Sequence, residues 1–497
     1  MEDTPNTKKE NILLFGVGKR LYEIIDEIIA HGYNVLAAAD NDSTKQGESI
    51  AYQDITFPVI SPTKISEYQF DKIIVTLALF ARQYEVNEQL LSMGIPAEKI
   101  GGWELGKFLD YPVISGSMKN ISSGKLYFDV SIMARHDDGT GIQRVVNNLY
   151  RNMTNVINDS IIPIRRFGVL LSAWSYRHKI LGYPFDDTET RISLTAKDKL
   201  LAADFSLVEI DAILQEANLS GTETYTIVYD LLPIFIPDKM PNANYSKDFL
   251  AWIRCVLSKS DHVLCISRTV ADDVIAFYRQ NKYKSTKPLK VHYFHLGFDL
   301  PTSTGEVRAA IKDFAQRQNV FLMVGTIEPR KNHILAMQAL RRIWQKDKAA
   351  VQLLIIGRDG WKNEGFKSLI QENDVREHVL WIGDASDAEL AWAYQNTTAL
   401  LYPSQNEGYG LPIVEAAHYH LPIICSDIPI LHELSGENAT YFTVDNVDSL
   451  AQTIETWLQT DIHPDASKIK LYSWQESAQE VLDILSGQAQ PYVTIEP

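Results

Sequence analysis

Two glutamates, Glu407 and Glu415, are separated by seven residues that include Gly408 and Gly410. Pro412 begins an apolar run that predicts a helix of about two turns, with Glu415 in its first turn, where the helix dipole favours a carboxylate. If both glutamates were helical they would lie about 12 Å apart, but the glycines allow the loop to fold back. Both carboxylates can then bind hydroxyl groups of one elongated ligand, while N–H groups at the helix start face its phosphates. The pattern favours a sugar-nucleotide site; the alternative is two unrelated surface glutamates beside a turn.

A basic pair, Arg330 and Lys331, follows a predicted strand over Val320–Val324 and the glycine Gly325. This position places two cations at an expected helix start, where each charge-assisted hydrogen bond to a phosphate contributes about 1.5–3 kcal/mol. The pair is therefore a candidate for neutralising a diphosphate leaving group. Adjacent basic residues are more often part of a solvated surface, and that alternative stays open.

The segment that carries both motifs alternates strands with helices, which requires parallel strands and right-handed crossovers and predicts a doubly wound α/β sheet. Its predicted strands are Val320–Val324, Gln352–Ile356, Val379–Ile382, Ala399–Tyr402 and Ile423–Cys425. Ligands of such sheets bind at the carboxyl ends of the strands. The loops expected at those ends are Gly325–Lys331, Gly357–Trp361, Gly383–Asp387 and Pro403–Pro412.

Two further α/β segments precede this one, with small polar residues marking a boundary near residue 122. The first opens as a Rossmann-like unit that lacks the third glycine of the fingerprint. Its predicted elements are the strands Ile12–Phe15, Val35–Ala39, Phe57–Ser61 and Lys72–Leu77 and the helices Arg20–His31 and Tyr84–Met93. The second segment is predicted to contain the strands Lys125–Val130, Phe205–Ile210, Thr226–Tyr229, His262–Ile266 and Lys290–Tyr293 and the helices Ile142–Met153 and Ala271–Arg279.

Composition sets further limits on function. A chain of 497 residues with 45% hydrophobic residues can bury about three domain cores. The net charge of −16 argues against broad contact with nucleic acid, so an anionic ligand must meet a local basic cluster. The three cysteines lie apart in apolar stretches, which favours buried thiols in a reducing compartment. No apolar run approaches a signal peptide or a membrane span, so the expected location is the cytoplasm.

The basic pair and the two glutamates together resemble the motifs of a known family. Residues 320–435 look like the donor-binding domain of the retaining GT-B glycosyltransferases of family 4, whose hallmark is two glutamates separated by seven residues, and the match extends over residues 125–485. The resemblance implies that Arg330 and Lys331 bind the donor diphosphate, that Glu415 binds the ribose and that Glu407 contacts the transferred sugar. It further implies that Gly325, Gly383, Gly408, Tyr409, Gly410 and Leu411 belong to the donor site, with the loop from Gly383 to Leu390 against the base.

The acceptor half of the resemblance is looser. Gly139, Thr140 and Gly141, followed by Gln143 and Arg144, resemble the glycine loop that faces the donor phosphate in this family, although Thr140 separates the glycines. The run from Tyr229 to Pro233 resembles an acceptor-side segment in which a histidine often precedes the aspartate. Tyr229 stands in the place of that histidine, and Asp230 is either catalytic or structural. The sequence also offers the polar candidates His136, His292 and His295, which are more often packing residues.

Two other segments have alternative interpretations. The first domain resembles sugar-nucleotide or cofactor-binding modules at Asp40, Asp42, Lys45 and Gly47, and Asp40 to Asp42 also fits the metal site of the other glycosyltransferase fold. Residues 161–183 mix four basic residues with aromatic and aliphatic ones. That composition suits an anionic membrane surface, or a strand and loop packed against the cleft with solvated basic tips.

The resemblance implies two doubly wound Rossmann-like domains facing a cleft, the GT-B architecture, with an additional Rossmann-like domain in front. The expected ranges are 1–122 for the accessory domain, 123–305 for the acceptor domain, 306–475 for the donor domain, and 476–497 for a helix and tail returning to the acceptor domain.

The implied activity is transfer of a hexose, with retention, from a nucleotide sugar to a glycan, lipid-linked glycan or glycoprotein acceptor in bacterial glycan synthesis. GDP-mannose is preferred over a UDP-hexose as donor. No cofactor or metal is expected, because cations and a helix dipole can stabilise the leaving diphosphate. The competing interpretation is a non-catalytic sugar-nucleotide sensor or scaffold.

Overall fold

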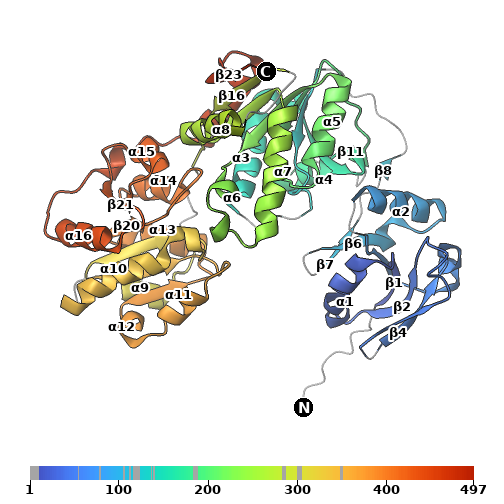
Figure 1. Cartoon of the computed structure of the whole chain (residues 1–497), viewed down its shortest axis with the longest axis horizontal. Coiled ribbons are helices and arrows are strands. Elements are labelled where there is room, and N and C mark those ends of the chain that lie inside the picture. The colour runs from blue at the N-terminus through green and yellow to red at the C-terminus, as the bar shows by residue number, and fades with distance from the viewer. Residues whose placement is uncertain are drawn as a thin grey trace. The chain divides into compact units, whose positions relative to one another are not determined.

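The computed structural model describes residues 10–53, 55–77, 80–104, 107–110, 114–115, 124–135, 137, 140–182, 189–281, 287–298, 305–346 and 351–496. Its contacts divide the chain into two compact units (Figure 1). One unit comprises Met1–Ser123, Asp129–Asp138 and Ile162–Thr195, and the other comprises Gly124–Phe128, Gly139–Ile161 and Ala196–Pro497. The predicted boundary near residue 122 lies outside the described residues, and the four predicted domain ranges remain predictions.

The first unit contains a seven-stranded sheet in the order β3-β4-β2-β1-β5-β6-β7. Its strands are β1 (Asn11–Phe15), β2 (Asn34–Ala39), β3 (Ser49–Tyr52), β4 (Ile55–Ile60), β5 (Lys72–Val75), β6 (Ile100–Glu104) and β7 (Lys107–Asp110), and its helices are α1 (Lys19–Ala30) and α2 (Phe80–Ser92). The central strands are parallel, whereas β3 and β7 run antiparallel at the two edges. Alternate residues of β1 enter two different cores, Leu13 and Phe15 in one and Ile12 and Leu14 in the other.

The first unit also contains the basic and aromatic segment of residues 161–183. It forms the antiparallel pair β10 (Ile161–Phe167) and β11 (Val169–Ser172), followed by α4 (Trp174–Leu181). Its buried apolar side chains include Phe167, Leu170, Leu171 and Tyr176. Because those side chains lie in the interior, the segment forms a packed strand pair and helix. Contact of its basic residues with a membrane stays a prediction. No helix among the described residues has the length and apolar character needed to cross a membrane.

The second unit contains the predicted doubly wound sheet, a six-stranded parallel sheet in the order β19-β18-β17-β20-β21-β22. Its strands are β17 (Val320–Val324), β18 (Gln352–Ile356), β19 (Val379–Ile382), β20 (Ala399–Tyr402), β21 (Ile423–Ser426) and β22 (Thr440–Phe442). The helices are α9 (Ala309–Ala315), α10 (His333–Lys346), α11 (Glu364–Leu369), α12 (Asn373–Arg376), α13 (Asp387–Asn396), α14 (Leu411–His418), α15 (Pro429–Ser435) and α16 (Val447–Leu458). Along β17, Val320 and Leu322 enter one core while Phe321 and Met323 enter the other, so both faces of the sheet are covered.

A second parallel array of strands holds the remaining elements of this unit. Strands β9, β13, β14, β15 and β16 follow one another in that order, and β23 from the C-terminus pairs antiparallel with β16. Their bounds are β9 (Leu126–Asp129), β13 (Lys199–Ala202), β14 (Glu223–Val228), β15 (His262–Cys265), β16 (Leu289–Tyr293) and β23 (Val493–Ile495). The helices are α3 (Gly141–Ile157), α5 (Ile210–Ser220), α6 (Leu232–Phe235), α7 (Ala243–Lys259), α8 (Arg268–Asn281) and α17 (Trp474–Ser486), of which α17 packs against α3.

The predicted strand Phe205–Ile210 is wrong. The strand is β13, and the residues after it form a turn that leads into α5. Local side-chain acceptors explain the difference: Asp204 accepts a hydrogen bond from the Phe205 N–H at 2.9 Å, and Ser206 accepts one from the Glu209 N–H at 3.2 Å. Short polar side chains that satisfy nearby N–H groups favour turns over strands.

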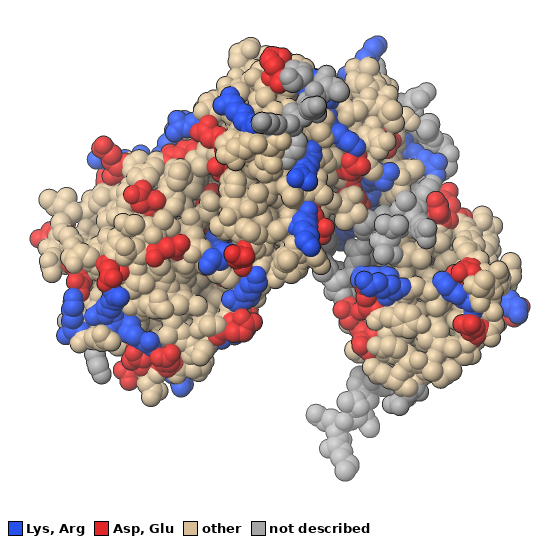
Figure 2. Space-filling view, in the orientation of Figure 1, with Lys and Arg blue, Asp and Glu red and all other residues tan. Residues whose placement is uncertain are grey.

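The surface charges and the cysteines lie only partly where the composition predicts. On the face drawn in Figure 2, basic and acidic residues of the described chain are interspersed rather than gathered into an extended basic surface. Cys265 and Cys425 are buried as predicted, but Cys255 on α7 is half-buried and donates a hydrogen bond to Asp211.

The two halves of the second unit contact each other at the N-terminus of α8. Glu433 of α15 accepts hydrogen bonds from the Arg268 N–H at 2.8 Å, the Thr269 N–H at 2.7 Å and the Thr269 hydroxyl at 2.6 Å. Next to it, the Ser267 hydroxyl donates to the Gly408 carbonyl at 3.0 Å. A carboxylate from one half of the unit therefore caps a helix of the other half, where the helix dipole favours a negative charge.

We expect Glu433→Ala to lower the free energy of unfolding of the second unit by about 1–2 kcal/mol, because it removes a charged helix cap. Glu437→Ala, an exposed glutamate two residues beyond the end of α15, is the matched control and is expected to be neutral. Urea unfolding followed by circular dichroism measures both. Equal midpoints for the two variants would contradict the capping role of Glu433.

Candidate active site

A cavity of about 480 Å³ opens at the carboxyl ends of β17, β18 and β20 in the second unit. The N-termini of α3 and α14 also reach it, so backbone N–H groups of two helices border the same space. Its lining includes the predicted residues Gly141, Asp230, Gly325, Arg330, Lys331, Glu407, Gly408, Tyr409, Gly410, Leu411 and Glu415. The cavity thus brings together residues that are far apart in sequence, at the place where ligands of doubly wound sheets bind.

An ion cluster forms one wall of the cavity. The Glu407 carboxylate lies 2.5 Å from Nη1 of Arg330 and 2.6 Å from Nζ of Lys331, and it also accepts a hydrogen bond from the Tyr402 hydroxyl at 2.8 Å. Glu328 lies 2.5 Å from Nη2 of Arg330. The side chains of Arg330 and Lys331 are only 14% and 12% exposed, so the alternative of a solvated basic surface is wrong.

The carboxylate of the cluster is ionised at neutral pH. Burial by itself would raise the pKa of Glu407, but Arg330 and Lys331 outweigh it and hold the pKa at about 2. Burial lowers the pKa of Lys331, and the Glu407 carboxylate opposes that shift. A buried charge without a partner is costly, so Lys331 depends on Glu407, whereas Arg330 pairs with both Glu407 and Glu328.

The backbone around the basic pair requires glycine at two positions. Gly325 has a φ of +139°, a conformation that other residues rarely adopt. A Cβ on Gly357 would lie 1.8 Å from the Gly325 carbonyl oxygen, so the two loops can approach only because Gly357 has no side chain. The expected helix start at Arg330 and Lys331 is instead a 3₁₀ turn over Pro329–Lys331, and α10 begins at His333 because Asn332 adopts a left-handed conformation.

Glu415 lies on α14 and is 3% exposed. One carboxylate oxygen accepts a hydrogen bond from the Tyr394 hydroxyl at 2.6 Å, and the other lies 3.5 Å from Nη1 of Arg144 on α3. The prediction that Glu415 occupies the first turn is wrong, because α14 begins at Leu411 and Glu415 is its fifth residue. Its orientation comes from Tyr394 and Arg144 rather than from the helix start.

The N-terminus of α3 is fixed by a capping box. The Thr140 side chain accepts a hydrogen bond from the Gln143 N–H, and the Gln143 side chain accepts one from the Thr140 N–H. A Cβ on Gly141 would lie 4.0 Å from Leu411 at the start of α14, so the two helix ends are neighbours. Gly139, the other glycine of this loop, lies outside the described residues.

Asp230 lines the cavity beside the glycine loop. A Cβ on Gly408 would lie 2.3 Å from the Tyr229 carbonyl oxygen and 3.1 Å from Cβ of Asp230, so Gly408 is needed for this contact. Burial raises the pKa of Asp230 and Arg330 opposes that shift, while the carboxylate accepts a hydrogen bond from the Leu232 N–H at 3.0 Å. The Tyr229 hydroxyl donates to the Ala203 carbonyl at 2.6 Å and is therefore already engaged.

Some predicted residues lie elsewhere. Gly383 is not part of the cavity lining, although Leu390 from the same predicted loop is. His292 is buried against His262, with ring nitrogens 3.0 Å apart, and His295 lies 3.3 Å from Glu480. His136 lies outside the described residues.

Asp40 of the first unit accepts hydrogen bonds from the glycine loop after β1 and from residues that follow it in sequence. Its carboxylate accepts hydrogen bonds from the Val17 N–H at 2.6 Å, from the Asp42 N–H at 2.8 Å and from Lys45 at 3.1 Å. The described residues contain no group of three or more potential ligands arranged to hold a metal ion. The Asp40 carboxylate therefore ties the end of β2 to the loop after β1, and the metal site stays an alternative prediction.

Three contributors to the site were not identified from the sequence: Tyr394, Tyr402 and the bridging role of Arg144. Tyr402 ends a predicted strand next to the loop that carries Glu407, and this position could have predicted that it lines the site. Tyr394 lies inside a helix, and nothing in its local sequence indicates that its hydroxyl bonds to Glu415.

Two family models match parts of the chain. Residues 307–474 match the family described as glycosyl transferases group 1, and residues 8–101 match the family described as C2185-like, N-terminal. The first match contains the basic pair and both glutamates. The second covers most of the seven-stranded sheet of the first unit.

Bacterial mannosyltransferases are among the proteins that are similar to this chain in sequence. The serotype-specific mannosyltransferase WbdA of Escherichia coli is 30% identical over 379 residues, which are 72% of this chain and 44% of WbdA. The O-antigen chain mannosyltransferase RfbU of Salmonella typhimurium is 27% identical over 231 residues, which are 46% of this chain and 59% of RfbU. The chain thus spans less than half the length of WbdA.

Solved structures agree in fold. HepE of Anabaena in complex with UDP superposes with a TM-score of 0.52 at 14% identity, covering 73% of this chain and 100% of HepE. HepE in complex with UDP and glucose gives a TM-score of 0.51 at 13% identity, covering 73% of this chain and 99% of HepE. Residues 307–474 are therefore a glycosyl transferases group 1 domain, and they belong to a chain with the GT-B fold.

Proposed function

We propose that this chain is a glycosyltransferase of bacterial polysaccharide synthesis that transfers a hexose, with retention, from a nucleotide sugar to a glycan acceptor. The observation that carries the proposal is the single cavity in which a buried cation pair, two helix N-termini and two oriented glutamates meet. A sugar nucleotide presents a diphosphate, a ribose and a sugar, and each has a chemically matched partner there. The names of WbdA and RfbU support mannose as the sugar, and we propose GDP-mannose before a UDP-hexose.

The diphosphate is the part of the donor that needs cations. Arg330 and Lys331 supply two positive charges, and the N–H groups at the starts of α3 and α14 add the positive ends of two helix dipoles. Because these groups are already ordered around Glu407, little reorganisation is required when negative charge develops on the leaving nucleoside diphosphate.

The two glutamates orient the other ends of the donor. Glu415 is held by Tyr394 and Arg144, and we propose that it binds the ribose hydroxyls. Glu407 already accepts hydrogen bonds or ion pairs from Arg330, Lys331 and Tyr402. We propose that the same carboxylate also accepts a hydrogen bond from a hydroxyl of the transferred sugar.

The acceptor enters beside Asp230, and its hydroxyl attacks on the face of the sugar from which the diphosphate leaves. The proton of the attacking hydroxyl passes to a phosphate oxygen of the leaving group. Asp230, whose side chain lines the same cavity as Arg330, orients the acceptor hydroxyl in this proposal. Tyr229 does not take part through its hydroxyl, because that group is bonded to Ala203.

A non-catalytic sugar-nucleotide sensor is the alternative. It would bind the nucleotide sugar in the same cavity but would release no nucleoside diphosphate when an acceptor is added. The buried cation pair favours the enzyme, because stabilising a leaving diphosphate is a need of transfer rather than of sensing.

We expect Glu415→Ala to lower kcat/KM for the donor about 10–100-fold, the loss that corresponds to one hydrogen bond of a charged group. Glu372→Ala, an exposed glutamate paired with Arg341, is the matched control. Release of nucleoside diphosphate in the presence of a mannose-terminated acceptor measures both. Full turnover by a folded Glu415→Ala variant would contradict the ribose assignment.

Replacement of Lys331 tests leaving-group stabilisation separately. Lys331→Met is expected to lower kcat about 10²–10³-fold, as loss of a preorganised donor does in other enzymes, with a smaller effect on KM. Lys346→Met, which changes an exposed lysine of the same domain, serves as control. A raised KM with unchanged kcat would instead show that Lys331 only binds the donor.

Turnover should persist in excess EDTA, because cationic side chains and helix dipoles supply the positive charge at the diphosphate. The measurement is nucleotide release before and after dialysis against EDTA, with and without added Mg²⁺. A loss restored by Mg²⁺ would assign part of that charge to a cation and correct the proposal.

A further inference from the structure

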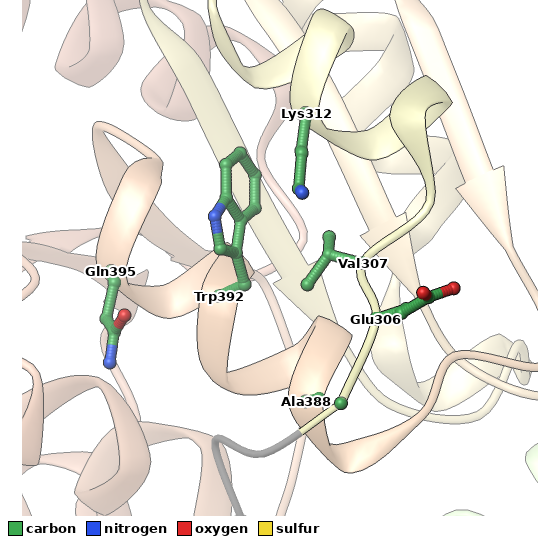
Figure 3. Close-up of a pocket in the computed structure, with 7 residues that line it drawn as sticks. Glu306, Val307, Lys312, Ala388, Trp392 and Gln395 are labelled. Carbon is green, nitrogen blue, oxygen red and sulfur yellow. The ribbon is translucent and has the colours of Figure 1, made fainter.

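A second cavity of about 460 Å³ lies on the donor-binding domain, between α9 and α13 (Figure 3). It is lined by Trp392, Gln395 and Ala388 of α13, by Lys312 of α9, and by Glu306 and Val307 of the segment before α9. Its volume falls in the range of about 300–1,000 Å³ that is usual for small-molecule sites. None of these residues lines the cavity described above.

Helix α13 separates the two cavities. Leu390 lines the cavity at the sheet end, and Tyr394 donates a hydrogen bond to Glu415 there. Trp392 and Gln395 lie on a different face of the same helix and line the second cavity. The second cavity is therefore adjacent to the proposed donor site without sharing its lining.

The aromatic wall of the cavity is preorganised. Trp392 and Val307 both pack against the hydrophobic core of the domain, yet Trp392 is only half-buried. The indole thus presents an open surface that loses little freedom when a ligand covers it. Such a surface suits an apolar face of a ligand.

The polar groups around the indole are exposed and available. Within the described part of the chain, the side chains of Lys312, Glu306 and Gln395 have no hydrogen-bond or ion-pair partner. Figure 3 shows the ammonium group of Lys312 reaching toward the space beside Trp392 and Val307. One cation, one anion and one amide provide both donors and acceptors and no net charge.

The cavity has an apolar surface bordered by hydrogen-bond donors and acceptors that together carry no net charge. This combination matches a sugar ring, which has an apolar C–H face and hydroxyl groups that both donate and accept. A nucleotide fits less well, because its phosphates would meet Glu306 as well as Lys312. We infer that this cavity binds hexose units of a neutral glycan. It is a site apart from the donor site, and it holds the acceptor or product chain. The inference rests on the proposed function for the identity of that chain.

The test is binding of α-linked mannotetraose, measured by ligand-observed NMR with GDP and UDP present at saturating concentration. Trp392→Ala should weaken binding about tenfold or more, whereas Trp392→Phe should retain most of the affinity. Gln395→Ala and Lys312→Met, both at exposed positions, should weaken it severalfold, and Gln452→Ala on α16 is the matched control that should not. Absence of binding to the native chain, or equal binding by all variants, would overturn the inference.

Transfer kinetics separate this inference from the proposed function. Trp392→Ala should raise KM for the tetrasaccharide acceptor while kcat stays unchanged. Tetrasaccharide binding that depends on Trp392 in a chain without transferase activity would refute the proposed function alone. Transfer with a KM that is independent of Trp392 would refute the second site alone.

Discussion

The structure of the site depends on one buried carboxylate shared by two cations. Glu407 holds Arg330 and Lys331 at 2.5 and 2.6 Å, in surroundings where either cation alone would be costly. The arrangement requires the strand end at Gly325, the close approach of Gly357 and the turn at Asn332, because each of these brings the basic pair to the Glu407 loop. Glycines and a left-handed asparagine therefore appear at the points where the loops must converge.

This ion cluster is also the local positive charge that an acidic chain needs in order to bind the diphosphate that we propose as its ligand. The net charge of −16 repels a diphosphate at long range, so local positive charge must be concentrated and kept dry. The cluster supplies it from side chains, and the starts of α3 and α14 supply it from the backbone. Under the proposed function, an entering diphosphate competes with Glu407 for cations that are already positioned.

The sequence predicted the strands of the six-stranded parallel sheet from β17 to β21 closely, because a parallel sheet covered on both faces has continuous apolar strands. It also identified Arg330, Lys331, Glu407 and Glu415, whose types and loop positions carry the chemistry. It did not predict the partners of Glu415, because the distance from Arg144 or Tyr394 to that glutamate is set by tertiary packing. The wrongly predicted strand at Phe205 has a local cause rather than a tertiary one. Hydrogen bonds to the side chains of Asp204 and Ser206 favour a turn there, although the stretch is apolar.

The central claim is that the cation pair recognises the diphosphate of a nucleotide donor. Calorimetric titration of the unmodified chain with GDP and with guanosine, and in parallel with UDP and uridine, tests it most directly. For the nucleotide used by this chain, the diphosphate form should bind at least about tenfold more tightly than the nucleoside, because two charge-assisted contacts are added. Equal affinity for the diphosphate and the nucleoside of both bases would contradict the claim.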